Sequence, residues 1–255
     1  MKFEEISRLI KGIPFMLPFQ GRCLYDLILQ EKTTDILELG VAHGVGTCYM
    51  AAALDELGIG KVTSVDRIDK SPVKAKPLPE ELIAETGLSR YVEIFRMHSG
   101  YTWFLHDEIK RLSQNDICRQ KYDLCYVDGS KNWTIDGFTF FLVDKILKDG
   151  GLIIFDDYDF AYSDSDSPET DGVKISDLSE DEKHTPHVKE IFELLVKQHP
   201  NYSELVIYDD MHWAVARKKL SVNKNYTVVY GQEFKNFFAF LKHYSKRLFQ
   251  IKINK

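Results

Sequence analysis

Residues 36–47 read ILELGVAHGVGT and carry the strongest structural signal in the chain. An apolar run typical of a strand leads into a turn with glycines at positions 40, 44 and 46, and an apolar stretch of helical length follows. Glycine lets a backbone pass close to a ligand, and the start of a helix offers unpaired N–H groups to a polar or anionic group. We therefore interpret this stretch as a ligand-binding strand–turn–helix unit.

The glycine spacing separates the candidate ligands. The turn reads G-x-x-x-G-x-G, whereas dinucleotide-binding turns read G-x-G-x-x-G, and no Gly-Lys-Ser/Thr follows to form a P-loop. The next expected strand ends at Asp66, 20 positions after Gly46, where an acid can accept hydrogen bonds from both hydroxyls of a ribose. A helix cap or a turn residue is the alternative role for Asp66.

The order of apolar and amphipathic runs predicts an α/β fold. Strands are expected at 35–39, 61–65, 92–96, 122–127, 152–155, 204–208 and 213–216, and helices at 46–57, 79–85, 102–112, 134–147 and 186–199. Apolar strands that alternate with helices form parallel sheets, and the last two strands are close enough to form a hairpin. We predict a Rossmann-like, doubly wound sheet of seven strands, mostly parallel, with an antiparallel edge hairpin.

Composition excludes several classes of protein. The 255 residues are 44% hydrophobic and 28% charged, with a formal net charge of −6, which is typical of a globular protein and disfavours a nucleic-acid binder. No apolar run approaches the ~20 residues that span a bilayer, and the first residues lack a signal-peptide pattern, so we expect a cytoplasmic location. The four cysteines form no C-x-x-C pair, which favours buried free thiols over zinc ligands or disulfides.

Two segments differ from this alternating pattern. Residues 158–185 contain nine acidic residues and two basic ones, which predicts an acidic insertion that forms a lid or a disordered loop. Residues 219–255 contain eight basic residues and one acid, with apolar side chains at helical spacing. We predict a domain at 1–218 and a basic amphipathic extension at 219–255. The extension is expected to dock on the domain or to form a homodimer contact, and contact with an anionic surface is the alternative.

Two further stretches complete a family pattern. Residues 122–129 read YDLCYVDG and residues 150–157 read GGLIIFDD. Together with ELG at 38–40 and SVD at 64–66, they resemble the class I S-adenosylmethionine-dependent methyltransferases. Within this class they are similar to the metal-dependent catechol-type and macrolide/sugar-type O-methyltransferases. The resemblance covers about residues 14–218.

The resemblance implies S-adenosylmethionine as the cofactor and assigns residues to its site. These residues are Glu38, Gly40, Ala42, Gly44, Asp66, Ser99 and Asp128. The three residues of the turn would line the amino-acid end of the cofactor, and Glu38 would support the turn. Asp66 would bind the ribose, and Ser99 would lie beside the adenine.

Three carboxylates follow two strands that are expected to be neighbours. Asp128 closes one strand, and Asp156 and Asp157 close the other, while adjacent strands lie ~4.8 Å apart. Like charges so close to one another favour a bound cation, and carboxylate oxygens suit Mg²⁺. We therefore predict a divalent metal site at Asp128, Asp156 and Asp157. The alternative is that the last two residues only begin a loop.

Lys131 follows Asp128 by three positions, the offset at which the catechol-type relatives carry a general-base lysine. We predict Lys131 and Asp128 as catalytic residues. The sugar-type relatives have an acid or His where this chain has Ser130 and Lys131, so an Asp is the alternative base, and Lys131 is then a surface lysine. The predicted function is metal-assisted O-methylation of a small hydroxylated molecule, a sugar or a secondary metabolite. Metal-independent methylation of another nucleophile and a cofactor-binding scaffold without catalysis are the alternatives.

Overall fold

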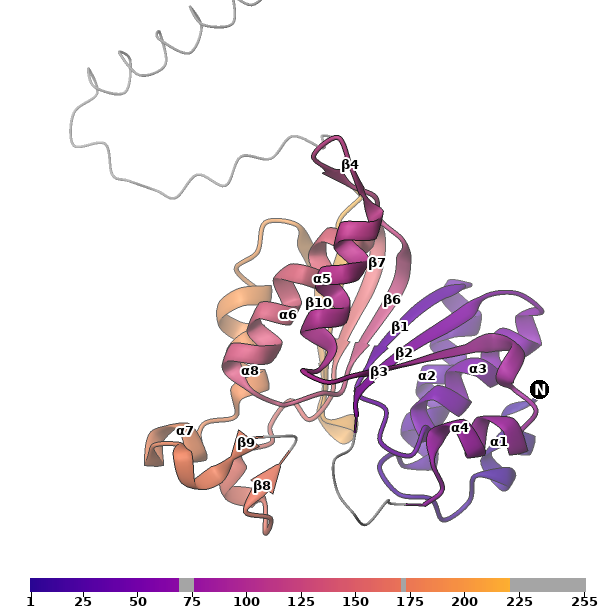
Figure 1. Ribbon diagram of the computed structural model, residues 1–255, viewed down its shortest axis with the longest axis horizontal. Coiled ribbons are helices and arrows are strands. Elements are labelled where there is room, and N and C mark those ends of the chain that lie inside the picture. Colours follow the sequence, from indigo (N-terminus) through magenta and orange to yellow (C-terminus); the bar gives the residue numbers. More distant parts are fainter. Residues whose placement is uncertain (69–75, 171–172, 221–255) are drawn as a thin grey trace, which may run out of the picture. The chain divides into compact units, whose positions relative to one another are not determined.

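The computed structural model describes residues 1–68, 76–170 and 173–220 (Figure 1). Helices and strands alternate along most of this part of the chain. Its first half contains α1 (Phe3–Leu9), α2 (Pro18–Glu31), β1 (Asp35–Leu39), α3 (Val45–Leu57), β2 (Lys61–Arg67), α4 (Pro79–Glu85), β3 (Val92–Met97) and α5 (Tyr101–Leu112). Its second half contains β6 (Tyr122–Val127), α6 (Trp133–Ile146), β7 (Leu147–Phe155), α8 (His187–Ile191), β10 (Tyr202–Tyr208) and β11 (Trp213–Lys218).

Seven of the strands form one sheet in the order β10-β11-β7-β6-β1-β2-β3. The five strands from β7 to β3 pair in parallel, whereas β11 is antiparallel to both β7 and β10. The predicted seven-stranded, doubly wound sheet with an antiparallel edge hairpin is therefore confirmed. The predicted strand at 152–155 begins earlier, at Leu147, and the predicted helix at 186–199 divides into α8 and a π-helical turn at Phe192–Val196.

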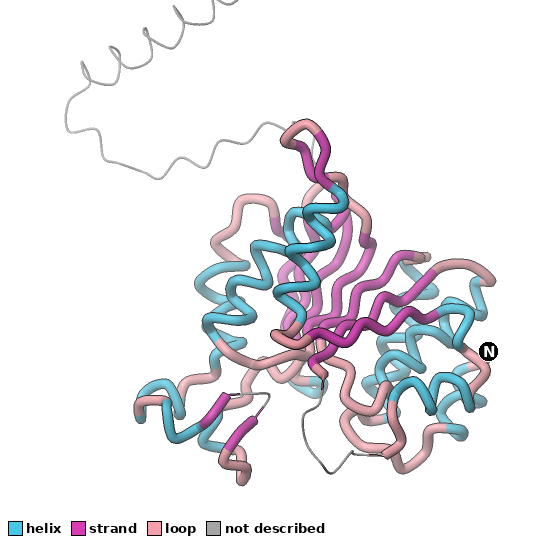
Figure 2. Tube along the Cα trace, in the orientation of Figure 1, coloured by secondary structure: helices cyan, strands magenta, loops and turns pink. Residues whose placement is uncertain are grey.

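Helices cover both faces of this sheet, as the cyan tubes of Figure 2 show. The apolar side chains of each central strand alternate between two cores. On β1, Ile36 belongs to the core beneath α2 and α3, whereas Leu37 and Leu39 belong to the core beneath α5 and α6. Each fully buried side chain of this kind contributes about 1.5–3 kcal/mol. The sheet is thus fixed from both sides, and its strand ends are held in place.

Several elements, most of them short, were not expected from the sequence. α1 and α2 precede the first strand, and two-residue strands pair as β4 (Ser113–Gln114) with β5 (Ile117–Cys118) and as β8 (Glu169–Thr170) with β9 (Val173–Lys174). The described part of the acidic segment also contains α7 (Glu180–His184). The predicted extension lies outside the described residues from position 221 onward.

Two further expectations concern the burial of the cysteines and membrane-spanning helices. All four cysteines are free thiols; Cys48 and Cys125 are buried as predicted. The prediction of burial is wrong for Cys23, which lies on the exposed side of α2, and Cys118 is only half-buried. Among the helices of the described ranges, none combines the length and the apolar character needed to cross a membrane.

Candidate active site

The predicted site residues lie where the parallel strands end. The hydrogen-bond ladder of the sheet continues one residue beyond β1, β6 and β7. The three additional bonds run from Gly40 N to Val65 O (2.9 Å), from Asp128 N to Leu39 O (2.8 Å) and from Asp156 N to Val127 O (3.0 Å). In open α/β sheets, ligands bind outside these carboxyl ends, where the strand order reverses. In this chain that position lies at β1, between β2 and β6.

The glycine turn after β1 is in backbone contact with the end of β6. Gly40 has a φ of 98°, and a Cβ at this position would collide with the carbonyl group of Asp128. Gly44, with a φ of 84°, is the cap residue of α3. Other residues adopt these left-handed conformations only at a cost, so the glycine spacing seen in the sequence has a steric cause at both positions.

Glu38 lies behind the turn and is buried. One of its carboxylate oxygens accepts hydrogen bonds from Thr47 Oγ1 (2.5 Å) on α3 and from Ser64 Oγ (2.6 Å) on β2. Burial raises the pKa of Glu38 to about 7, although both hydrogen bonds oppose the shift. Glu38 therefore connects β1, β2 and the helix that follows the turn, which agrees with a supporting role and not with direct ligand contact.

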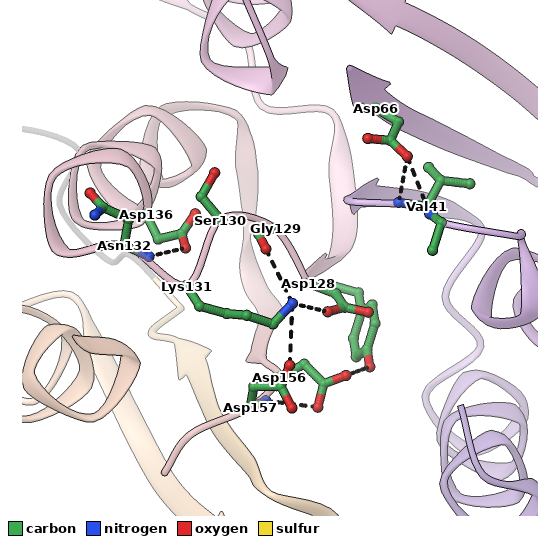
Figure 3. Close-up of polar contacts among 12 residues, drawn as sticks. Val41, Asp66, Asp128, Gly129, Ser130, Lys131, Asn132, Asp136, Asp156 and Asp157 are labelled. Atoms are coloured by element: carbon green, nitrogen blue, oxygen red, sulfur yellow. Dashed lines mark hydrogen bonds and ion pairs between the residues drawn. The ribbon is translucent and has the colours of Figure 1, made fainter. Parts of the chain in front are cut away.

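Asp66 lies at the same edge of the sheet, at the end of β2. Its Oδ2 accepts hydrogen bonds from the backbone N–H groups of Val41 (3.3 Å; Figure 3) and Ala42 (3.2 Å). Arg96 Nη1 lies 3.5 Å from the same oxygen. Burial raises the pKa of Asp66, while these donors and Arg96 oppose the shift. The carboxylate thus faces the glycine turn. Ser99, the residue predicted to lie beside the adenine, is exposed in the loop that follows β3.

A cavity of about 2050 Å³ lies over these strand ends. The predicted residues that line it are Gly40, Ala42, Asp66, Ser99, Asp128, Lys131, Asp156 and Asp157. Sites for one small ligand usually measure about 300–1,000 Å³, so this cavity has room for a cofactor and a second molecule. Its walls also include Phe15, whose ring stacks on His43 with 5.4 Å between the ring centroids.

The three predicted carboxylates lie together with Lys131 (Figure 3). Lys131 Nζ lies 3.2 Å from Asp128 Oδ1 and 3.2 Å from Asp157 Oδ2. Asp156 Oδ2 accepts a hydrogen bond from Tyr126 OH (2.5 Å), and Asp156 Oδ1 accepts one from the Asp157 N–H group (2.8 Å). The ends of β6 and β7, which were predicted from the sequence to be neighbours, therefore lie side by side in the structure.

The charges of this cluster strongly affect one another. Burial and the carboxylates of Asp156 and Asp157 raise the pKa of Asp128 well above its usual range, against the opposing effect of Lys131. Burial and the charge of Asp157 also raise the pKa of Asp156, to about 6. Because three acids face one lysine here, additional positive charge would stabilise their ionised forms.

The predicted metal site stays a prediction. Throughout the described ranges, no three acidic, His or Cys side chains are grouped in a way that could hold a metal ion as they stand. The Lys131 ammonium lies between Asp128 and Asp157 instead. The donor chemistry nevertheless fits a hard dication, because the cluster offers several carboxylate oxygens and an excess of negative charge.

Some polar residues around the cluster were not expected from the sequence. Tyr126 contacts Asp156, and Arg96 connects Asp66 to Glu80 on α4 through a hydrogen bond from Nε to Oε1 (2.9 Å). No local pattern marks these residues, because each contact joins positions that are distant in the sequence. Strand position was the only available signal, since Tyr126 and Arg96 lie near the carboxyl ends of β6 and β3.

Comparisons with known proteins agree with this geometry. Residues 37–158 match the model of a family described as a methyltransferase domain. A search of the curated proteins found no match. Among solved structures, an O-methyltransferase from Bacillus cereus in complex with S-adenosylhomocysteine is similar, with 19% identity and a TM-score of 0.58 over 86% of this chain and 92% of that chain.

Two further structures are similar to the same extent. A putative caffeoyl-CoA O-methyltransferase from Staphylococcus aureus has 20% identity and a TM-score of 0.57 over 86% of this chain and 92% of its own. TomG from Streptomyces achromogenes, an O-methyltransferase involved in tomaymycin synthesis and solved with S-adenosylmethionine, has 16% identity and a TM-score of 0.55 over 85% and 89%. The resemblance inferred from the sequence motifs is thus confirmed: residues 37–158 match a methyltransferase domain, and the described part of the chain has the fold of these O-methyltransferases.

Proposed function

We propose that this chain transfers the methyl group of S-adenosylmethionine to a hydroxyl group of a small molecule, a sugar or a secondary metabolite, with the assistance of a divalent metal ion. The observation that carries this proposal is that Asp128, Lys131 and Asp156 line the same cavity as the glycine turn. A turn suited to the cofactor and a charged cluster suited to a hydroxyl group therefore share one space.

The residues of the strand ends would orient the two reactants. Asp66 would accept hydrogen bonds from the ribose hydroxyls, and Gly40 would allow the cofactor to lie close to the end of β6. The acceptor oxygen would form a bond to the methyl carbon as the carbon–sulfur bond breaks, which yields S-adenosylhomocysteine. Holding the reactants in line can lower the barrier by about 7–11 kcal/mol.

We propose that Lys131 accepts the proton of the acceptor's hydroxyl group. In its neutral form the amine can accept this proton, and its position between Asp128 and Asp157 places it at the end of β6 and β7. The ammonium ion that results would be stabilised by the same two carboxylates. Toward Lys131, Asp128 therefore has two proposed tasks, which are to orient the amine before the transfer and to pair with it afterwards.

The metal ion would be held by Asp128, Asp156 and Asp157. When bound there, a dication would lower the pKa of the acceptor hydroxyl and fix its orientation. Support for this part of the proposal comes from the raised pKa values of Asp128 and Asp156, which result first from burial and then from the neighbouring carboxylates. Cytoplasmic location is likewise inferred from the sequence.

Calorimetry and a methyl-transfer assay test the proposal. Binding of S-adenosylhomocysteine is measured with and without MgCl₂, and hydroxylated metabolites are screened with S-adenosylmethionine that carries a tritiated methyl group. Asp156→Ala is expected to abolish transfer and to retain the affinity for S-adenosylhomocysteine. Asp149→Ala, on the same strand but at its opposite end, is the control and is expected to retain both. A folded Asp156→Ala protein that no longer binds S-adenosylhomocysteine would contradict the assignment of Asp156 to the metal.

Metal-independent methyl transfer is the second candidate. The observation that favours it is the Lys131 ammonium between Asp128 and Asp157, which already supplies a positive charge to the cluster. Treatment with EDTA followed by the return of MgCl₂ separates the two candidates. Activity that is lost and then restored supports the metal-assisted reaction, whereas activity that survives thorough chelation supports the second candidate.

A further inference from the structure

The loop that carries Lys131 is bonded to four buried side chains. Figure 3 shows Ser130, Lys131 and Asn132 of this loop, which lies between β6 and α6, and four of the loop's backbone groups on either side of Lys131 have side-chain partners. The four bonds run from Ser130 N to Tyr101 OH (2.9 Å), from Tyr162 OH to Ser130 O (2.8 Å), from Asn132 N to Asp136 Oδ2 (3.1 Å) and from Trp133 N to His187 Nδ1 (3.2 Å).

The four partners come from four different elements of the fold. Tyr101 begins α5 and Asp136 lies on α6, and the hydroxyl of Tyr101 also donates to Asp136 Oδ1. Tyr162 belongs to the acidic segment, and His187 lies just beyond it at the start of α8. His187 Nε2 lies 2.9 Å from Glu182 O, so its Nδ1 is left to accept from the loop.

The partners of the loop are buried, and the backbone at Lys131 is strained. Tyr162 is 1% exposed, Asp136 is 1% exposed and His187 is 5% exposed, and a buried polar group is tolerated only when it is hydrogen-bonded. Lys131 itself has a left-handed backbone with a φ of 52°, as does its ion-pair partner Asp157 with a φ of 53°. Such conformations in residues other than glycine persist only where the surroundings enforce them, and they concentrate at functional sites.

We infer that Tyr162 and His187 are positioning residues for Lys131. They hold the backbone on both sides of Lys131, so that its amine stays between Asp128 and Asp157 at the cavity. The acidic segment would then contribute to the chemistry of the site through the Tyr162 hydroxyl, although this hydroxyl touches neither reactant. This inference rests on the role proposed above for Lys131.

The test measures the accessibility of the Lys131 amine in the free protein. Trace labelling with acetic anhydride, quantified by mass spectrometry, gives the acetylation rate of Lys131 relative to the exposed Lys145. Tyr162→Phe is expected to raise this ratio about fivefold, because the loss of one hydrogen bond releases the loop by about that factor. The affinity for S-adenosylhomocysteine should stay unchanged, since the Tyr162 hydroxyl donates to the Ser130 carbonyl and not to the glycine turn or Asp66.

Tyr158→Phe is the matched control. Tyr158 is also buried, lies four residues from Tyr162 and donates to Glu193 Oε1 (2.9 Å), away from the loop. Its substitution should leave the labelling ratio at the wild-type value. Equal ratios for Tyr162→Phe and Tyr158→Phe would overturn the inference, because the Tyr162 hydroxyl would then have no specific effect on Lys131.

A second pair of variants keeps the inference testable if Tyr162→Phe does not fold. His187→Leu should raise the labelling ratio of Lys131. His187→Asn retains an acceptor for the Trp133 N–H group and should keep the ratio near the wild-type value. Equal ratios in these two variants would also overturn the inference. The underlying role of Lys131 is checked separately by Lys131→Met in the methyl-transfer assay. A wild-type transfer rate in that variant would reject the proposed base, whereas the labelling ratios report only on the position of the amine.

Discussion

Replacing Glu38 by Gln is expected to remove a pH-dependent loss of stability. Glu38 is 2% exposed, and burial raises its pKa from its usual 4.5 to about 7. The unfolded chain therefore releases this proton at a lower pH than the folded protein does, so the folded state loses stability as the pH rises from about 4.5 to 7. At about 1.4 kcal/mol for each tenfold change, the full loss is about 3 kcal/mol.

The hydrogen bonds of Glu38 make Gln a suitable replacement. Thr47 and Ser64 both donate to the same carboxylate oxygen, and the amide oxygen of Gln can accept both bonds. The variant thus retains the link between β1, β2 and α3 but cannot ionise. The other acids with raised pKa values, such as Asp128 and Asp156, titrate in both proteins, so their effects largely cancel in the difference.

The measurement is urea unfolding of both proteins between pH 4 and pH 8. The free energy of unfolding of the wild type, minus that of Glu38→Gln, should fall by about 3 kcal/mol across the titration and become level at about pH 8. A difference that stays constant within about 0.5 kcal/mol over this range would refute the argument that burial controls the ionisation of Glu38.

Further predictions concern the cofactor side of the cavity. Gly40→Ala should abolish S-adenosylhomocysteine binding and lower the melting temperature, because the new Cβ collides with the Asp128 carbonyl. Gly87→Ala is its control: φ is 74° and nothing lies within 4 Å, so it should cost only about 1–2 kcal/mol and keep the affinity. Asp66→Ala should weaken S-adenosylhomocysteine binding about 10- to 100-fold in calorimetry, since it removes a charged acceptor. Unchanged affinity in Asp66→Ala would exclude it from the ribose site.

The sheet and the strand ends could be predicted from the sequence because they depend on local patterns. Short stretches rich in strand-forming residues mark each central strand, and Asp66, Asp128 and Asp156 each follow such a stretch directly. The strand order then brings two of these acids together. By contrast, α1 spans seven residues, and β4 and β8 of the two small hairpins span two each. These elements are too short for a helical or alternating pattern to be recognised.

The side-chain arrangement of the site could not be predicted in the same way. The pair between Lys131 and Asp157 depends on left-handed backbones at both residues, which the sequence does not signal because neither is glycine. The bond between Tyr162 and Ser130 joins positions 32 residues apart, so no local pattern in the sequence signals it. The boundary between domain and extension, the homodimer contact and the metal ligands stay predictions.

The three backbone hydrogen bonds that continue the sheet past β1, β6 and β7 fix the distances across the site. They set the spacing between Gly40, Asp128 and Asp156 by peptide geometry, whatever loops follow. Residues 165–170, which form another wall of the cavity, begin well beyond the last of these bonds. That wall can therefore be exchanged without changing the distance between the cofactor turn and the acidic cluster. We expect a new acceptor preference to be obtainable by grafting at 165–170 while Tyr162 is retained, with the chemistry left where the sheet holds it.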